Sequence, residues 1–244
     1  MISTGYQQRT YRNLIKSDSL VSFNVISQET DLLVHAKKPL NKLTLEMVLK
    51  HRGFIEKYIR ENPEFSKTLV PWNIEGFAPK IIRDMIYAGK KAGVGPMAAV
   101  AGAVAENVGN GLLSYSDEVI VENGGDVFFK TNNALTVGIY AADSPLSLKI
   151  GLRIDSCGQP VAVCTSSGTV GHSLSFGKAD AVCIVSDSCS LADAVATSLG
   201  NRVKKKKDIN DAIKFGNTIE GVKGIVIIIG DAAGFWGDVE VVSL

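Results

Sequence analysis

The sequence predicts an α+β fold whose sheets are largely antiparallel. Two patterns favour this class over a doubly wound parallel sheet. Neighbouring predicted strands are joined by short loops, and pairs of strands alternate with pairs of helices. The 244 residues include 24 glycines and only 7% aromatic residues. We therefore expect many tight turns and an interior built from Ala, Val, Ile and Leu.

The N-terminal third alternates between the two kinds of element. Alternating apolar and polar residues predict half-buried strands at residues 11–15, 20–25 and 31–36. A helix is predicted from Thr44, because apolar side chains then recur at three- and four-residue spacing, and Pro63 should end it. The prolines and the glycine of residues 63–78 predict an irregular crossing segment.

Two further helices are predicted before residue 110. Pro79 suits the first turn of a helix that runs to about Lys91, and residues 93–96 should break the chain. Residues 97–108 then form a helix of small side chains. The missing bulk allows close approach of either another backbone or a flat ligand. This helix is therefore expected to line a ligand cleft or a tight packing seam.

The second half of the chain is predicted to be rich in strands. Asn123-Gly124 fits a tight turn in a hairpin over residues 119–129. Further strands are expected at residues 136–140, 148–152, 161–164, 181–185, 225–229 and 239–242, the last two joined by a Gly-rich turn. A helix capped by Ser190 should cover 191–203, and a short helix should open at Asp208. The pattern leaves open whether residues 1–244 form one domain or two intertwined α+β halves that meet near 130–150.

Composition excludes several classes of function. Lys and Arg total 26 and Asp and Glu total 25, so a net charge of +1 gives no electrostatic case for nucleic acid or an anionic membrane. The run Lys204 to Lys207 is expected to be a solvated helix end. No apolar run approaches the roughly 20 residues needed to span a bilayer. Because residues 1–12 lack an apolar signal core, a cytoplasmic location is expected. The four cysteines show no CxxC pair, which predicts reduced, mostly buried thiols rather than a zinc site.

Two Gly-punctuated polar clusters are candidates for binding a phosphorylated ligand. The first, residues 122–126, contains Gly124, Gly125 and Asp126. The second follows an apolar strand directly and contains Thr165, Ser166, Ser167, Gly168, Thr169 and His172. Backbone amides freed by glycine and flanked by hydroxyls can hold phosphate oxygens. A plain polar loop is the alternative, since neither a Walker loop nor a Rossmann fingerprint is present.

A third cluster suggests a metal site. Asp193 and Thr197 lie four residues apart on the helix predicted at 191–203, so their side chains share one face. A carboxylate and a hydroxyl are hard donors suited to a Mg²⁺ ion that keeps some waters and bridges to a ligand phosphate. The alternative is structural: an Asp favoured by the helix dipole and a Thr that bonds back to a carbonyl.

At these clusters the sequence resembles the ApbE-like superfamily. Its best-known branch is the FAD:protein FMN transferases, and a shorter, largely archaeal and bacterial branch of uncharacterised ApbE-like proteins is more similar. The similarity to that branch covers nearly the whole chain, through motifs at residues 94–102, 121–126, 164–180 and 192–197. The similarity to the transferases is confined to roughly 94–201. The resemblance implies a T-fold-like α+β architecture with antiparallel sheets and paired helices.

The resemblance also implies roles for individual residues. Asp193 and Thr197 match the Asp and Thr that bind Mg²⁺ in the transferases. Positions that help to hold FAD match Thr165, Ser166, Gly168 and His172, and the Gly-Gly-Asp strand pair matches residues 124–126. His172 is the candidate catalytic residue, since it could orient the ligand or move a proton.

Two departures from the transferases reduce the match. Their Lys-Gly pair is Ala101-Gly102 here, and no Asp-Pro follows His172. Both weaken the case for FMN transfer more than the case for binding a flavin or nucleotide. The first hypothesis is a Mg²⁺-dependent, FAD-processing or FMN transferase-like enzyme with a small phosphorylated ligand and a protein acceptor. The second is a non-catalytic binding protein for FAD, FMN or another phosphorylated metabolite, supporting sulfur assimilation toward homocysteine. The third is a homo-oligomer that kept the fold and lost the site.

Overall fold

The computed structural model of the protein describes residues 20–74, 76–168 and 176–244. The strands are β1 (Val21–Ser27), β2 (Thr30–Ala36), β3 (Val119–Asn123), β4 (Asp126–Lys130), β5 (Leu135–Gly138), β6 (Ile150–Ile154), β7 (Val161–Ser166), β8 (Ala181–Ser186), β9 (Val222–Ile229), β10 (Ala232–Gly237) and β11 (Glu240–Ser243). The α-helices are α1 (Asn41–Glu61), α2 (Lys80–Ala92), α3 (Val100–Leu112), α4 (Cys189–Arg202) and α5 (Ile209–Asn217). Short 3₁₀ turns cover Pro63–Ser66, Pro96–Ala99 and Lys206–Asp208.

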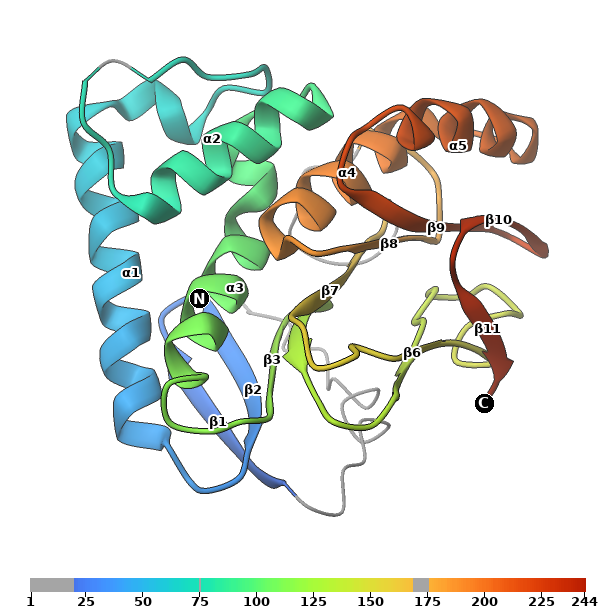
Figure 1. The fold of residues 1–244 in the computed structure, drawn as a ribbon. Helices are drawn as coiled ribbons and strands as arrows, with labels where there is room; N and C mark the ends of the chain where they lie inside the picture. Colours follow the sequence, from blue (N-terminus) through green and yellow to red (C-terminus); the bar gives the residue numbers. More distant parts are fainter. Residues whose placement is uncertain (1–19, 75, 169–175) are drawn as a thin grey trace, which may run out of the picture.

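A large antiparallel sheet organises the molecule. Its strand order is β1-β2-β3-β4-β7-β8-β9-β10, and a second sheet has the order β11-β6-β5. Every pairing in both sheets is antiparallel. The α-helices gather on one side of the large sheet, and β6 and β11 lie on the other (Figure 1). The predicted α+β class with antiparallel sheets is confirmed.

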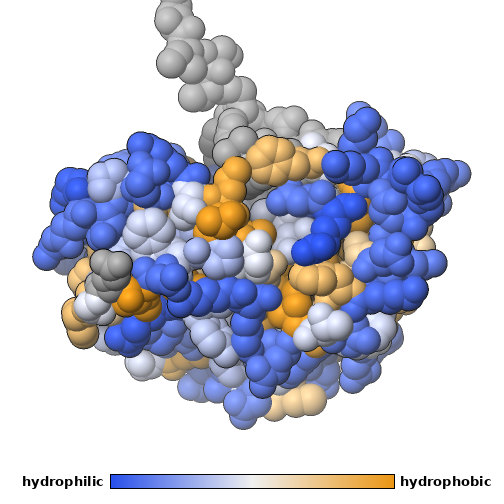
Figure 2. All heavy atoms as spheres, turned by 90° about the horizontal axis from the view of Figure 1, so that it is seen from above, coloured by the Kyte–Doolittle hydropathy of each residue, from blue (hydrophilic) through white to orange (hydrophobic). Residues whose placement is uncertain are grey.

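Both faces of the large sheet are buried. In β9, the side chains of Ile225 and Ile227 pack with the helices, whereas those of Val226 and Ile228 pack with the small sheet. All four are fully buried. This two-sided burial explains why β9 is a continuous apolar run rather than an alternating one. The face seen in Figure 2 is hydrophilic over most of its area, in agreement with the globular composition.

The structure confirms most of the predicted elements and shifts several ends. Helix α1 begins at Asn41, before the expected Thr44. Pro79 is the N-cap of α2, and Gly93 ends that helix in the left-handed conformation with a φ of 72°. The predicted small-residue helix is divided into a 3₁₀ turn and α3. The strand predicted at 11–15 lies outside the described residues.

Two local predictions were wrong. The side chain of Ser188, rather than Ser190, caps α4 by accepting the Leu191 amide at 3.3 Å. The expected Gly-rich turn after residue 229 is much shorter than predicted, because β10 occupies most of it. The turn is only Gly230-Asp231. Gly234 packs under α5 instead, where a Cβ would collide with the side chain of Ile209.

No helix in the described part of the chain is both long and apolar enough to cross a membrane.

Candidate functional site

The hairpin between β3 and β4 has the tight turn that Asn-Gly predicts. Gly124 and Gly125 have φ angles of 69° and 121°, values that glycine adopts without strain. The turn is fixed to α3 because the Asn123 side-chain amide donates to the Ala101 carbonyl at 3.0 Å. It also lies beside the second cluster, since the Thr165 amide donates to the Gly125 carbonyl at 3.2 Å.

Helices α3 and α4 approach closely at Gly102. A Cβ there would collide with the Cys189 carbonyl and would lie 2.8 Å from the Cβ of Asp193. Gly102 is itself fully packed in the core between these helices. The small-residue helix therefore forms the tight packing seam that was one of its two predicted roles.

Asp193 reaches across this seam to the start of α3. Its Oδ2 accepts the Gly102 amide at 2.9 Å. Amides in the first turn of a helix have no partner within the helix, and the N-cap residue Ala99 offers no side-chain bond. The Asp193 carboxylate supplies the missing acceptor. A carboxylate has about four lone-pair positions, so this bond leaves room for a cation.

The side chain of Asp126 is the second carboxyl group at this point. It is only 6% exposed. Burial and the neighbouring Asp193 raise its pKa well above the usual range. Burial also raises the pKa of Asp193 to about 7. The Gly102 and Ala101 amides oppose this rise, because they favour the charged form of the carboxyl group. Both carboxyl groups therefore favour their protonated forms more than an exposed aspartate does.

Thr197 lies one helical turn beyond Asp193 on α4. Both side chains are half-buried, whereas residues 194–196 between them are buried. Within the described residues, no three His, Cys, Asp or Glu side chains form a metal cluster. The donor set here is oxygen only: two carboxyl groups and one hydroxyl. That chemistry fits a Mg²⁺ ion that keeps water ligands and completes its shell with phosphate.

The end of β7 contributes the polar residues of the second cluster. Thr165, Ser166, Ser167 and Gly168 are all half-buried. The Gly168 amide donates to the Ala179 carbonyl at 2.8 Å, so it is not open to a phosphate in this conformation. Thr169 and His172 lie outside the described residues. The structure therefore brings Gly125, Asp126, Thr165 and Asp193 together.

A protein-family model described as "AbpE bacteria" matches residues 12–238, nearly the whole chain. A UPF0280 protein of Methanococcus aeolicus is 39% identical over 221 residues, which cover 88% of this chain and 89% of the relative. A UPF0280 protein of Methanosarcina acetivorans is also 39% identical, over 88% of this chain and 86% of the relative. The chain belongs to the AbpE bacteria family.

Solved structures show that this family member shares its fold with ApbE proteins. The flavinyl transferase ApbE of Pseudomonas stutzeri matches with a TM-score of 0.57 and 13% identity, over 92% of this chain and 94% of that one. The ApbE protein of Thermotoga maritima matches with a TM-score of 0.54 and 13% identity, over 88% of this chain and 96% of that one. At such identities the likeness establishes the fold.

Sequence reasoning missed one residue of this AbpE bacteria chain that supports the site. The Oε2 atom of Glu106 accepts hydrogen bonds from the Ser188 hydroxyl, the Ser190 amide and the Ser190 hydroxyl, at 3.1, 2.9 and 3.0 Å. Glu106 thereby holds the first turn of α4. Asp193 and Thr197 lie further along the same helix. The available signal was that Glu106 is the only charged residue in the sequence of α3.

Proposed function

We propose that this protein binds FAD together with Mg²⁺ and cleaves the diphosphate, releasing AMP and passing FMN to an acceptor. One observation carries the proposal. Asp193 and Thr197 lie one helical turn apart on α4, and Asp193 is next to Asp126. Asp126 directly follows the Gly125 turn, whose carbonyl is bonded by the Thr165 amide of β7. Phosphate oxygens and a cation need this combination of carboxylate, hydroxyl and glycine backbone.

Each described residue has a separate task in this proposal. Asp193 and Thr197 would hold Mg²⁺, which neutralises charge on the diphosphate when it is bound. Asp126, whose pKa the neighbouring Asp193 raises, is proposed to orient the Asp193 carboxyl group by hydrogen bonding to it. The turn at Gly125 and the end of β7 at Thr165 are proposed to bring backbone near the ligand, with the hydroxyls of Thr165 and Ser166 as further donors. His172 is proposed to move a proton or orient the ligand.

FMN is the alternative flavin ligand. The proposed acceptor of the FMN group is a hydroxyl of a protein in the cytoplasm.

Calorimetric titration of FAD with and without Mg²⁺ tests the binding step. Wild type is expected to bind more tightly with Mg²⁺ than in EDTA. Asp193→Asn keeps an oxygen acceptor for the Gly102 amide but removes the charge, so the Mg²⁺ effect should be lost while folding is kept. Thr197→Val should weaken binding less, because a neutral donor is lost. Asp211→Asn on α5, where the side chain is exposed, is the matched control. Equal FAD binding by wild type in EDTA and in Mg²⁺ would defeat the proposal.

The second candidate is a protein that holds a flavin or another phosphorylated metabolite without turnover. It is favoured by Ala101, which stands where the resembling transferases carry a lysine. Within the described residues, no basic side chain forms an ion pair with Asp126 or Asp193. Chromatographic detection of AMP after incubation with FAD and Mg²⁺ separates the two functions. AMP above the EDTA control supports the enzyme, whereas tight binding without AMP supports the binding protein.

A further inference from the structure

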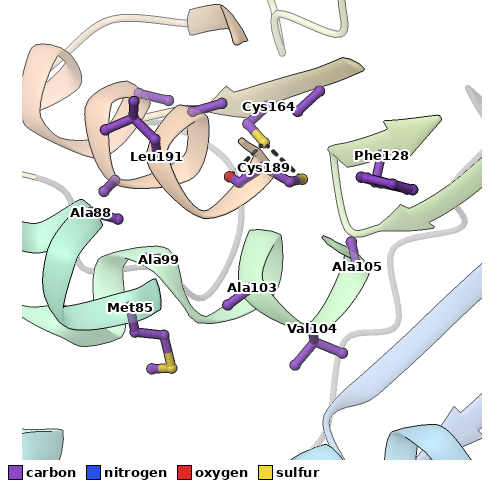
Figure 3. Packing of buried hydrophobic residues seen from close by; sticks show 14 of the residues in the cluster. Met85, Ala88, Ala99, Ala103, Val104, Ala105, Phe128, Cys164, Cys189 and Leu191 are labelled. Atoms are coloured by element: carbon purple, nitrogen blue, oxygen red, sulfur yellow. Dashed lines mark hydrogen bonds between the residues drawn. The ribbon is translucent and has the colours of Figure 1, made fainter. Parts of the chain in front are cut away.

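Two buried thiols meet just beneath the candidate site. The Sγ atom of Cys164, on β7, lies 3.4 Å from the Sγ of Cys189, the first residue of α4, and 3.4 Å from the Cys189 carbonyl oxygen (Figure 3). Both residues are fully buried and both are free thiols. The two sulfurs are therefore in contact with each other although 25 residues separate them in the chain.

The position of this pair links it to the helix that carries Asp193. Cys189 lies one turn before Asp193 on α4, and its carbonyl packs against Gly102. On the other side, Cys164 is paired with Asp126 in the neighbouring strand β4. The thiol pair therefore adjoins both the seam between α3 and α4 and the two carboxyl groups.

We propose that Cys164 and Cys189 form a reversible disulfide that changes the geometry of the first turn of α4. The oxidant is a peroxide. The two thiols lose two protons and two electrons and a sulfur–sulfur bond forms. Hydrogen peroxide, the oxidant, takes up both electrons and both protons as its O–O bond breaks, and gives two water molecules. A thiol reductant returns both cysteines to the free state.

The bond requires a local rearrangement. A disulfide bond is about 2.05 Å long, so the sulfurs must move closer by more than about 1 Å from their present separation. Cys164 would also lose the hydrogen that it directs to the Cys189 carbonyl. Because the α3–α4 seam has no spare room at Gly102, the first turn of α4 cannot shift without disturbing the Asp193 contact.

Burial keeps the reduced pair stable. It raises the pKa of Cys189 to about 12 and that of Cys164 well above its usual range, so both thiols stay protonated at neutral pH. Only a small oxidant that enters during local opening can then react. The pair should accordingly remain reduced in a thiol-rich compartment and oxidise under peroxide stress.

The test uses the full chain, reduced, desalted and treated with hydrogen peroxide. Cys157→Ser serves as the background, because Cys157 is exposed and would cross-link molecules. Intact mass should fall by two hydrogens, and non-reducing peptide mapping should join Cys164 to Cys189. Hydrogen exchange of residues 188–193 should change on oxidation and return on reduction. Cys183→Ser should behave like the background, because Cys183 is equally buried but packs on the opposite face of the sheet.

Cys189→Ser and Cys164→Ala should each abolish the mass change. One of the two variants is enough for this test, provided that it keeps the wild-type melting profile. The proposal is overturned if peroxide gives only sulfinic or sulfonic acids, or if the disulfide forms without any change in exchange of residues 188–193. Loss of Mg²⁺-dependent FAD affinity on oxidation is also expected, and this single readout rests on the proposed function. If reduced protein fails to bind FAD, that function fails, while mapping and hydrogen exchange still decide the disulfide.

Discussion

Asp193 accepts the backbone amide of Gly102 at 2.9 Å although 91 positions separate the two residues in the chain. Glu106 makes the reverse connection from α3 to the start of α4. Each of the two helices thus has an amide of its first turn bonded to a carboxylate of the other. Such carboxylates also interact favourably with the positive end of a helix dipole. The site is built on this reciprocal arrangement.

Gly102→Ala is expected to lower the free energy of unfolding by about 1–3 kcal/mol, because the added Cβ overpacks the seam against the Cys189 carbonyl. Gly102→Leu should be at least as damaging. Urea unfolding measures both. Gly53→Ala is the control, since a Cβ there meets nothing within 4 Å and should stabilise α1 by about 0.5–1 kcal/mol. If Gly102→Ala unfolds at the wild-type urea concentration, the seam is looser than its contacts indicate.

Glu106→Ala should cost about 1–3 kcal/mol, because the Ser190 amide and two hydroxyls lose their acceptor. Glu106→Gln should cost less, as its amide oxygen can still accept. Chemical unfolding gives both values. Glu46→Ala, an exposed change on α1, provides the baseline for removing a surface glutamate. Equal stability of the Glu106 and Glu46 variants would show that the cap contributes nothing.

The stability of the protein should fall as pH rises from about 4 to about 7 through the contribution of Asp193. The pKa of this group is 3.8 when unperturbed and about 7 in the folded protein. Between those values the folded state binds more protons than the unfolded state, so raising the pH favours unfolding. Burial lowers the pKa values of His35 and His51, whose contributions instead increase as pH rises toward about 6.5.

The contribution of Asp193, together with its effect on the pKa of Asp126, is isolated by comparing melting temperatures of wild type and Asp193→Asn across this range. The contributions of His35 and His51 to the pH dependence of stability are the same in both proteins and cancel in the comparison. Wild type should lose stability relative to the variant as the pH is raised. A constant difference between the two melting curves would show that Asp193 does not titrate there.

Replacing Lys204, Lys205, Lys206 and Lys207 together with glutamine should leave Mg²⁺-dependent FAD affinity unchanged. All four residues are exposed, and Lys206 pairs with Asp231 on the surface. Exposed charges of this kind are screened by salt and contribute little at a distance. Calorimetry at two salt concentrations measures the effect. A large loss of affinity that is recovered at low salt would show that these lysines steer the ligand.

Local signals in the sequence were enough to predict most of the fold. Pro79 and Gly93 bound α2 as expected, and Asn123-Gly124 produced the predicted hairpin. The glycine count misled at β10, because Gly234 serves packing under α5 rather than a turn. Local spacing indicates what a residue can do on its own element, and it says nothing about a side chain that fills space from elsewhere.

The sequence predicted each cluster of the candidate site separately, but not the contacts between the clusters. Asp193 and Thr197 were linked by helical spacing, and the Gly-Gly-Asp turn by its hairpin. The contact between Asp126 and Asp193 depends on how α4 crosses the sheet, which no short pattern encodes. For the same reason Glu106 was overlooked, since its partners lie 82 and 84 positions away.

The pairing of Asp126 with Cys164 in neighbouring strands has a kinetic consequence. The candidate site is assembled from four stretches of chain that meet only through contacts between residues distant in sequence. Closing such long loops costs entropy before the contacts form, and topologies of this kind fold slowly. A truncated fragment is therefore expected to lack the site altogether. A ligand that occupies it would stabilise the entire fold by mass action, and its thermal shift would report the integrity of the whole sheet.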